Sequence, residues 1–479
     1  MKTFHYFLTI MWLFFFTLPL NVLAENKEMP ITTSSKEALN YFIAGRAKFE
    51  DFEFINATSL FDKAIQKDPD FAMAYLYRSF SSGGYNVLRQ NLDQAVKLVN
   101  KVSEGERYEI LYYQARTTGD YQKEKEYLNL LLKLLYTDKR VQLLAGNYYY
   151  YQNDYTNALQ HYRKCSELDK TYELAYNMIG YCQSGLGNYQ AAEKAFQTYI
   201  KLSPNNPNPY DSYAELLLKM GKYDSSIEQY KKALEKDPNY LSSMAGIGNN
   251  YIFKGNFETA RKYYQEFFDK SPSIDSKLSA LYWKAVSYVH EGNTEKAVNV
   301  FDEYRALAEQ ENLVNEEFAA YKYQGYILSE SGNPAEGIKY FEKANALIAK
   351  SKLSDFEKEN LNTCSMLCRF YYLTIQDKLL KAKLESDNCK QKVELRKNPN
   401  EKKQLHSIFI IYQIKKGDYN KAIECSKLAS GNPMDWYYTA IAYKKMGDKN
   451  NSQKLFDQIR KWNVNSLDLA LIRKNALEE

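Results

Sequence analysis

Small, aromatic and turn-forming residues recur along this chain with a common period of 34 residues, which divides its apolar stretches into similar units. One row places small residues inside apolar stretches, at Gly146, Gly180, Ala214 and Gly248. A second row pairs a turn former with an aromatic two residues later: Gly119 with Tyr121, Asn153 with Tyr155, Gly187 with Tyr189, Gly221 with Tyr223 and Gly255 with Phe257. A third row consists of Pro204, Pro238 and Pro272. Coincident rows at such a period predict a stack of one repeated supersecondary unit.

Each row predicts one feature of a pair of helices. A small residue in the first helix lets the second helix approach closely, so that Gly180 and Ala192 mark facing points of one pair. Glycine or asparagine at the end of the first helix accepts the left-handed backbone of a C-cap. The aromatic residue opens the second helix, and proline ends it because proline cannot continue the hydrogen-bond ladder. We therefore expect an all-α chain.

The pattern resembles the tetratricopeptide-repeat (TPR) family. The unit that starts at residue 173 carries it as Tyr176, Gly180, Gly187, Tyr189, Ala192, Phe196 and Pro204. The first unit, from residue 38, carries it as Tyr41, Gly45, Ala57, Phe61, Ala64 and Pro69. The resemblance implies a right-handed superhelical solenoid of about twelve helix-turn-helix units. Within this family, the chain most resembles exported bacterial proteins built of TPR units alone.

The rows also predict how the chain is organised. Further units begin near residues 72, 105, 139, 173, 207 and 241. We expect a signal peptide at 1–24, a lead at 25–37, a TPR array at 38–351 that is most regular at 105–274, an irregular helical pair at 352–402, degenerate TPR units at 403–462 and a C-terminal cap at 463–479. A terminal unit must shield the apolar face of its neighbour, which is the role expected of the cap.

The first 24 residues differ from the rest of the chain. Lys2 precedes an apolar run of 14 residues from Phe7 to Leu20, and a small residue, Ala24, offers a cleavage site before Glu25. This arrangement is typical of a secretory signal peptide. The alternative is an uncleaved membrane anchor, although the run is shorter than the roughly 20 residues that span a bilayer. We expect an exported protein, periplasmic or secreted, with no stable membrane span after cleavage.

Composition and charge narrow the expected function. The chain has 479 residues with 44 Tyr and 24 Phe, only 11 Pro and 20 Gly, and a net charge of +5. Basic and acidic residues alternate, whereas a nucleic-acid reader concentrates basic residues on one face. The basic cluster at 390–403 is interpreted as a solvated loop between two helices. The six cysteines are expected to be buried free thiols, with disulfides left open because export permits them.

The sequence shows no catalytic, metal or cofactor signature. His161, His290 and His406 lie in different units, and Cys364, Cys368 and Cys389 have no nearby histidine to complete a zinc site. His161 and Cys165 have helical spacing, but Cys165 occupies a packing position and a catalytic thiol must be accessible. We therefore expect a protein that is not an enzyme and needs no cofactor.

The resemblance implies that partners bind the concave surface lined by the first helix of each unit. Family positions place eight candidate residues there: Asn147, Tyr150, Asn177, Tyr181, Asp211, Glu215, Asn249 and Phe253. Some of these tyrosines could instead pack between helices. Asp211 and Glu215 stand where a clamp for acidic tails needs basic residues, which favours neutral or basic extended segments over acidic C-terminal tails.

The leading hypothesis is a protein interaction scaffold or adaptor that holds partner segments in this groove and does not bind nucleic acid. The alternative is a receptor that stacks a carbohydrate or small metabolite on the aromatic inner surface. A third hypothesis, an enzyme built on the irregular pair, has only the three cysteines in its favour. The sequence leaves the partner's identity and the oligomeric state open.

Overall fold

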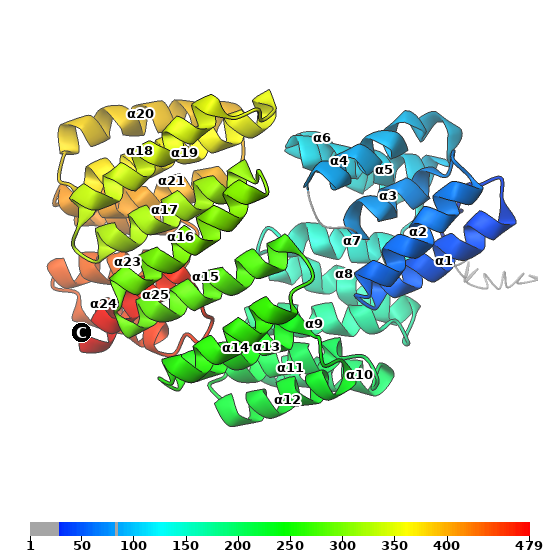
Figure 1. Ribbon diagram of the computed structural model, residues 1–479, viewed down its shortest axis with the longest axis horizontal. Coiled ribbons are helices and arrows are strands. Elements are labelled where there is room, and N and C mark those ends of the chain that lie inside the picture. Colours follow the sequence, from blue (N-terminus) through cyan, green and yellow to red (C-terminus); the bar gives the residue numbers. More distant parts are fainter. Residues whose placement is uncertain (1–27, 82–84) are drawn as a thin grey trace, which may run out of the picture.

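The computed structural model describes residues 28–81 and 85–479, so the expected signal peptide lies outside the described residues. In this described part the chain forms 25 α-helices and one 3₁₀ turn, and no strand (Figure 1). The helices follow one another as twelve antiparallel pairs and a final helix, α25. The expected all-α TPR solenoid of about twelve units is confirmed.

The first fourteen helices are short and regular. Their bounds are α1 Lys36–Glu50, α2 Phe54–Lys67, α3 Ala72–Ser81, α4 Tyr85–Lys97, α5 Glu104–Thr118, α6 Tyr121–Leu134, α7 Lys139–Tyr150, α8 Tyr155–Leu168, α9 Glu173–Gly185, α10 Tyr189–Leu202, α11 Asn208–Lys219, α12 Tyr223–Lys236, α13 Leu241–Phe253 and α14 Phe257–Lys270. The predicted aromatic row opens α6, α8, α10, α12 and α14. The turn formers before these helices adopt positive φ, from 61° at Asn153 to 78° at Gly187, as a left-handed C-cap requires.

The row of small residues sets the distance between paired helices. A Cβ atom added to Gly180 would lie 2.6 Å from the ring of Phe196, and one added to Gly248 would lie 2.5 Å from the ring of Tyr264. Both rings are almost completely buried. The aromatic residue of the second helix thus fills the space that a side chain on the first helix would need.

The remaining helices are mostly longer. Their bounds are α15 Ile274–Glu291, α16 Thr294–Gln310, α17 Val314–Glu330, α18 Pro334–Lys350, α19 Asp355–Ile375, α20 Leu379–Arg396, α21 Pro399–Lys415, α22 Tyr419–Ser426, α23 Pro433–Lys445, α24 Lys449–Arg460 and α25 Leu467–Glu478. Helices α19 and α20 lie within 352–402, where an irregular pair was expected, and α21 begins at Pro399, before the boundary expected at 403.

The basic cluster at 390–403 is not a loop, as the sequence suggested, but the end of α20 and the start of α21. Two of its charges, on Lys392 and Arg396, are neutralised locally. Arg396 pairs with Glu401 at 2.9 Å and lies 3.7 Å from Glu359, which also pairs with Lys392. The cluster is helical because acidic partners on α19 and α21 offset the repulsion between its basic residues.

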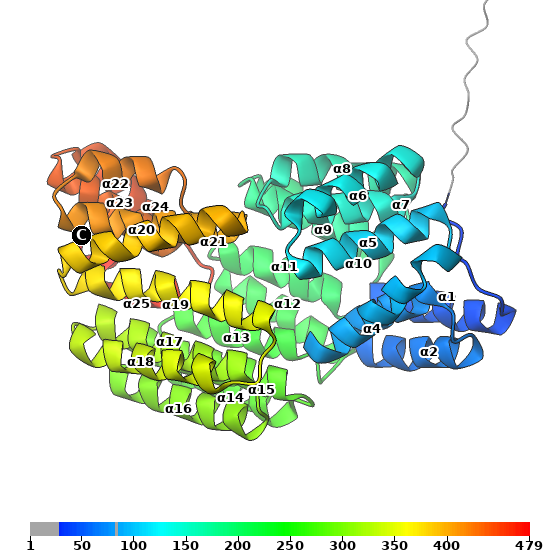
Figure 2. The ribbon, with the colours of Figure 1, turned by 90° about the horizontal axis from the view of Figure 1, so that it is seen from above.

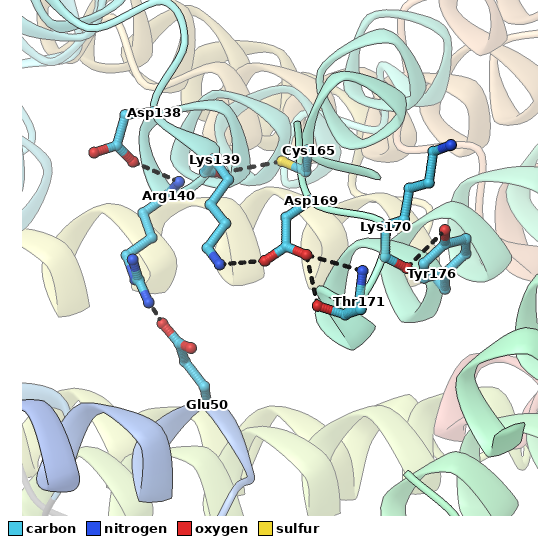
Figure 3. A network of polar contacts seen from close by, with 9 residues as sticks. All are labelled: Glu50, Asp138, Lys139, Arg140, Cys165, Asp169, Lys170, Thr171 and Tyr176. Carbon is cyan, nitrogen blue, oxygen red and sulfur yellow. Dashed lines mark hydrogen bonds and ion pairs between the residues drawn. The ribbon is translucent and has the colours of Figure 1, made fainter. Parts of the chain in front are cut away.

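The first repeat touches helices far along the chain (Figure 3). Glu50, at the end of α1, pairs with Arg140 of α7 at 2.9 Å. Beside it, Lys139 pairs with Asp169 at 2.5 Å, and Cys165 donates to the Lys139 carbonyl at 3.1 Å. These contacts join α1 to the turn between α8 and α9, so the early repeats curve back on themselves.

The last repeats close into a ring. Inner helices α17, α19, α21, α23 and α25 each contact the next, and α25 packs back on α15. Tyr282 of α15 and Tyr323 of α17 complete the circle with their rings 5.3 Å apart. In both views α1–α8 lie at one end of the molecule and α16–α25 at the other, with α11–α15 between them (Figure 1 and Figure 2).

Candidate functional site

Three of the expected partner-binding residues come together on the inner face of α7, α9 and α11. The Tyr181 hydroxyl donates to Glu215 Oε2 at 2.5 Å and to Ser212 Oγ at 3.2 Å. Tyr150 also lies near Glu215. Burial is the main cause that raises the pKa of Tyr150, and the charges of neighbours including Glu215 add to it. We call Tyr150, Tyr181 and Glu215 the inner-face cluster. The 34-residue period explains it, since Tyr181 and Glu215 are one repeat apart and occupy equivalent positions on adjacent helices.

The inner-face cluster combines an acidic group with aromatic surface. Glu215 reaches solvent, but the residues packed around it raise the pKa of its carboxyl through burial. Lys219, one turn later, donates to the Ser184 carbonyl at 3.0 Å and lies over the Trp462 ring at 5.5 Å. Burial lowers the pKa of Lys219. Glu215 is therefore the carboxylate that this face presents to solvent.

Asn177 and Asp211 were expected on the open surface, and the structure corrects this. They are only 3% and 7% exposed, because neighbouring inner helices pack closely at both positions. Asn177 donates to Asn208 at 3.4 Å, and Asp211 accepts from Ser243 at 2.6 Å. Burial, followed by the charge of Glu215, raises the pKa of Asp211 and favours its neutral form. Both side chains therefore join helices together.

Asn147 and Asn249 hold their own repeats together. The Tyr162 hydroxyl donates to Asn147 Oδ1 at 2.7 Å, and the Tyr264 hydroxyl donates to Asn249 Oδ1 at the same distance. Both tyrosines are fully buried, so each bond satisfies a hydroxyl that would otherwise be costly to bury. The amide oxygens of these two candidate residues are thus already engaged within the chain.

The C-terminal segment covers the α13 part of the inner face. We call residues 461–473 the C-terminal strap. Asn465 donates to Asn249 at 2.8 Å, and the guanidinium of Arg473 lies 4.9 Å from the centre of the Phe253 ring. Earlier in the strap, Asn463 accepts from the Tyr223 hydroxyl at 2.9 Å. The expected cap therefore does more than cover the last repeat, because it also fills the surface around Asn249 and Phe253.

Two cavities lie in the C-terminal ring, with volumes of about 320 Å³ and about 370 Å³. The larger of these two lies at the centre of the ring. We call this larger space the C-terminal cavity. All six inner helices of the ring line it. Its aromatic and charged lining residues are Tyr282, Lys322, Tyr323, Tyr326, Tyr371, Asp435 and Asp468. The sequence rows gave no sign of it, because ring closure depends on contacts between distant helices.

Two thiols of α19 face the C-terminal cavity. A hydrogen bond from Cys368 and the nearby charge of Lys322 lower the pKa of Cys364, against the effect of burial. The same hydrogen bond, together with burial, raises the pKa of Cys368. The cavity thus places the Cys364 thiol near the Lys322 ammonium group.

Cys165 and His161, the pair with helical spacing, have structural roles. Cys165 is completely buried, and burial raises the pKa of its thiol. His161 is held by Gln142 at 2.8 Å and stacks on Tyr149. Across residues 28–81 and 85–479, no group of three His, Cys, Asp or Glu side chains is arranged to hold a metal ion. The helices of the same ranges include none long and apolar enough to cross a membrane.

Family models described as tetratricopeptide repeat match residues 143–207, 208–240 and 245–312, which include the whole inner-face cluster. A TPR repeat-containing protein of Methanocaldococcus jannaschii is 26% identical over 346 residues, covering 66% of this chain and 54% of the relative. Anaphase-promoting complex subunit 3 of Schizosaccharomyces pombe is 25% identical over 175 residues, covering 36% of this chain and 25% of the relative. Tetratricopeptide repeats therefore make up residues 143–240 and 245–312 of this chain.

The chain spans about half or less of the length of these relatives. Among solved structures, a tetratricopeptide repeat protein from Parabacteroides merdae is 15% identical, with a TM-score of 0.35, and the match covers 54% of this chain and 99% of that one.

Proposed function

We propose that this chain is a non-enzymatic scaffold that holds an extended segment of a protein partner against the inner face of α7, α9 and α11. The inner-face cluster carries this proposal. Glu215 is exposed there beside Tyr150 and Tyr181, whereas Asn177 and Asp211 are buried and the α13 surface is covered by the strap. The open part of the inner face is thus small, aromatic and acidic.

This chemistry favours a neutral or basic segment. Tyrosine supplies contact area at low cost in conformational entropy. A basic side chain of the partner would pair with Glu215, whereas an acidic tail would bring a like charge to a partly desolvated carboxylate. Lys219 offers little compensation for an acidic tail, since its ammonium group is engaged by Ser184 and lies near the Trp462 ring.

Stacking of a carbohydrate or metabolite on this face has less support. Tyr181 meets Phe196 edge to face at 5.3 Å, and Tyr150 meets Tyr155 in the same way at 5.5 Å. The chain's own aromatic residues therefore use part of the ring surface that a stacked ligand would need. Hydrogen bonding through Tyr181 and charge on Glu215 favour a peptide segment.

Family context agrees with a scaffold. Anaphase-promoting complex subunit 3 is named as a subunit of a complex, and a further relative of 28% identity over 102 residues is an Hsp70-Hsp90 organizing protein of Arabidopsis thaliana. We propose further that the chain is exported, periplasmic or secreted, with its first 24 residues as a cleaved signal peptide. Sequencing the N-terminus of the mature protein tests this point.

Binding of short peptides of varied charge to the mature chain tests the proposed function. Fluorescence anisotropy should show tighter binding of neutral and basic peptides than of acidic ones. Glu215→Gln should weaken the best basic peptide at least about tenfold, because it removes a charge-assisted contact.

Glu258→Gln provides the matched control, since Glu258 is exposed on α14 and pairs with Lys262 of the same helix. This variant should bind like the wild type. Preference for acidic peptides, or equal losses in both variants, would show that the inner-face cluster is not the binding site.

A further inference from the structure

We propose that the C-terminal cavity binds a small zwitterion, a molecule with one carboxylate and one ammonium group on a largely apolar body, as in an amino acid or a dipeptide. This site is independent of the proposed scaffold function, because its lining comes from α15 to α25 and the inner-face cluster comes from α7 to α11. Three features of the cavity support the proposal: its unpaired charges, its aromatic lining and its size.

A basic and an acidic residue line the cavity without a partner of opposite charge in direct contact. Within the part of the chain that the structure describes, Lys322 Nζ has no carboxylate within 4.0 Å. It lies over the Tyr323 ring at 5.2 Å and near the Cys364 thiol, whose pKa its charge lowers. In the same ranges the Asp468 carboxylate makes no hydrogen bond or ion pair. Both residues are half-buried. Charged groups removed from water are costly unless they are paired, so each is a contact point for an opposite charge on a ligand.

The second carboxylate of the cavity is already used. Asp435 caps α23, where it accepts from the Gly431 amide at 2.7 Å and from the Asn432 amide at 3.3 Å. Burial, and then the negative charge of Asp435, raise the pKa of Asp468. An ammonium group beside Asp468 would relieve this repulsion, and a carboxylate would find an opposite charge at Lys322.

A ligand with a single charge fits the cavity less well. An amine would pair with Asp468 but leave Lys322 without an opposite charge from the ligand. A carboxylic acid would pair with Lys322 but add a third negative group to Asp435 and Asp468. A zwitterion offers an opposite charge to Asp468 and to Lys322 at the same time.

The rest of the lining suits an apolar body. Tyrosines 282, 323, 326 and 371 supply ring faces and hydroxyls, and aliphatic side chains supply the remaining wall: Leu367, Ile408, Ile411, Leu467 and Leu471. Tyrosine rings also attract an ammonium group. The volume of about 370 Å³ lies at the lower end of the range of small-molecule sites, which suits a single amino acid or a dipeptide.

A thermal-shift screen of the mature chain with the common amino acids and their alanyl dipeptides tests the proposal. At about 5 mM, at least one of these should raise the melting temperature, and calorimetry should then give its Kd. The best ligand is compared with its decarboxylated amine and its deaminated acid. Each analogue should bind at least about tenfold more weakly. The screen also distinguishes free amino acids from dipeptides.

Variants of the two charged residues locate the site. Lys322→Met and Asp468→Asn should each weaken the zwitterion at least about tenfold. The controls Lys350→Met and Asp269→Asn replace exposed residues on α18 and α14 and should bind like the wild type. Circular dichroism verifies folding, and the analogue series on the wild type decides the matter if a variant fails to fold.

Cys364 provides a reporter inside the cavity. Its rate of alkylation by iodoacetamide, followed by mass spectrometry, should fall when the zwitterion is present, because the ligand shields the thiol. The proposal is overturned if no amino acid or dipeptide binds, if the amine or the acid binds as tightly as the zwitterion, or if binding leaves the alkylation rate of Cys364 unchanged.

Discussion

Asn465 donates a hydrogen bond to Asn249 at 2.8 Å across 216 residues of sequence. Asn465 Oδ1 also lies 2.9 Å from His290 Nε2, so one side chain of the C-terminal strap joins α13 to α15. Burial lowers the pKa of His290 to about 4, so the ring is neutral at ordinary pH and can donate this bond. The strap therefore links the regular central repeats to the closed C-terminal ring.

Asn465→Ala should loosen this link. It removes these two bonds and a longer one to the Tyr264 hydroxyl at 3.5 Å from a buried side chain, which costs about 1–3 kcal/mol locally. Hydrogen–deuterium exchange should increase in residues 463–473 and in α13, with little change in α1–α6. The exposed Asn450→Ala on α24 serves as the control and should leave exchange in α13 unchanged. Equal exchange in both variants would mean that the strap does not stabilise α13.

Gly180→Ala should destabilise the repeat at α9 and α10. The new Cβ atom would lie 2.6 Å from the ring of Phe196, and overpacking of this kind costs about 1–3 kcal/mol. Urea denaturation measures the effect. Adding Phe196→Leu should make the double variant more stable than the sum of the single changes predicts, because the smaller side chain leaves room for the new Cβ atom. Simple additivity would argue against the close approach.

The Glu50 and Arg140 pair should contribute more than an exposed pair. Their side chains are only 19% and 22% exposed, and they join α1 to α7. A double-mutant cycle with Glu50→Gln and Arg140→Met should give a coupling of about 1–2 kcal/mol. The exposed Glu258 and Lys262 pair should give less than about 0.5 kcal/mol in the same cycle. Similar values for the two pairs would contradict the closure of the early repeats.

Glu109 should make stability fall as the pH rises. Burial, and then the charge of Asp138, raise its pKa from 4.5 to about 8. Charged neighbours that act on it also include Arg46, Glu106 and Arg140. A carboxyl whose pKa is higher in the folded chain stabilises the fold in full when the pH is below its pKa in the unfolded chain. This contribution is lost as the pH rises toward 8.

Glu109→Gln removes the group that must take up a proton on folding. The variant should therefore unfold less readily than the wild type at about pH 7, by up to about 3 kcal/mol, and the difference should shrink toward about pH 4.5. Urea denaturation across this range measures it. Glu104→Gln, on the exposed side of the same helix, should show no such trend. A constant difference at every pH would contradict a raised pKa.

The sequence predicted the parts of the fold that depend on local chemistry. The turn formers Gly119 and Gly187 adopt the left-handed conformation, and Tyr121 and Tyr189 begin the helices that follow them. These outcomes follow because a C-cap and a small contact residue act within one helix pair. The basic cluster at 390–403 was interpreted wrongly, since the acidic partner Glu359 lies on another helix.

The candidate site was predictable only in part. Repeat positions brought Tyr181 and Glu215 onto one face, but the burial of Asn177 and Asp211 depends on how tightly neighbouring inner helices pack. Nothing in the 34-residue pattern indicates that Asn465 returns to α13, or that α25 packs on α15. Such contacts are set by the curvature of the whole array.

Site-specific photo-crosslinking tests the scaffold function most directly. A photoreactive amino acid replaces Tyr181 on the inner face or, as the control, Tyr263 on the outer helix α14, and the protein is irradiated in its native cells. We predict a discrete partner adduct at position 181 that disappears when Glu215→Lys is added, and no such adduct at position 263. An absence of adducts at 181, or the same adducts at 263, would contradict the proposal that the inner face holds a partner.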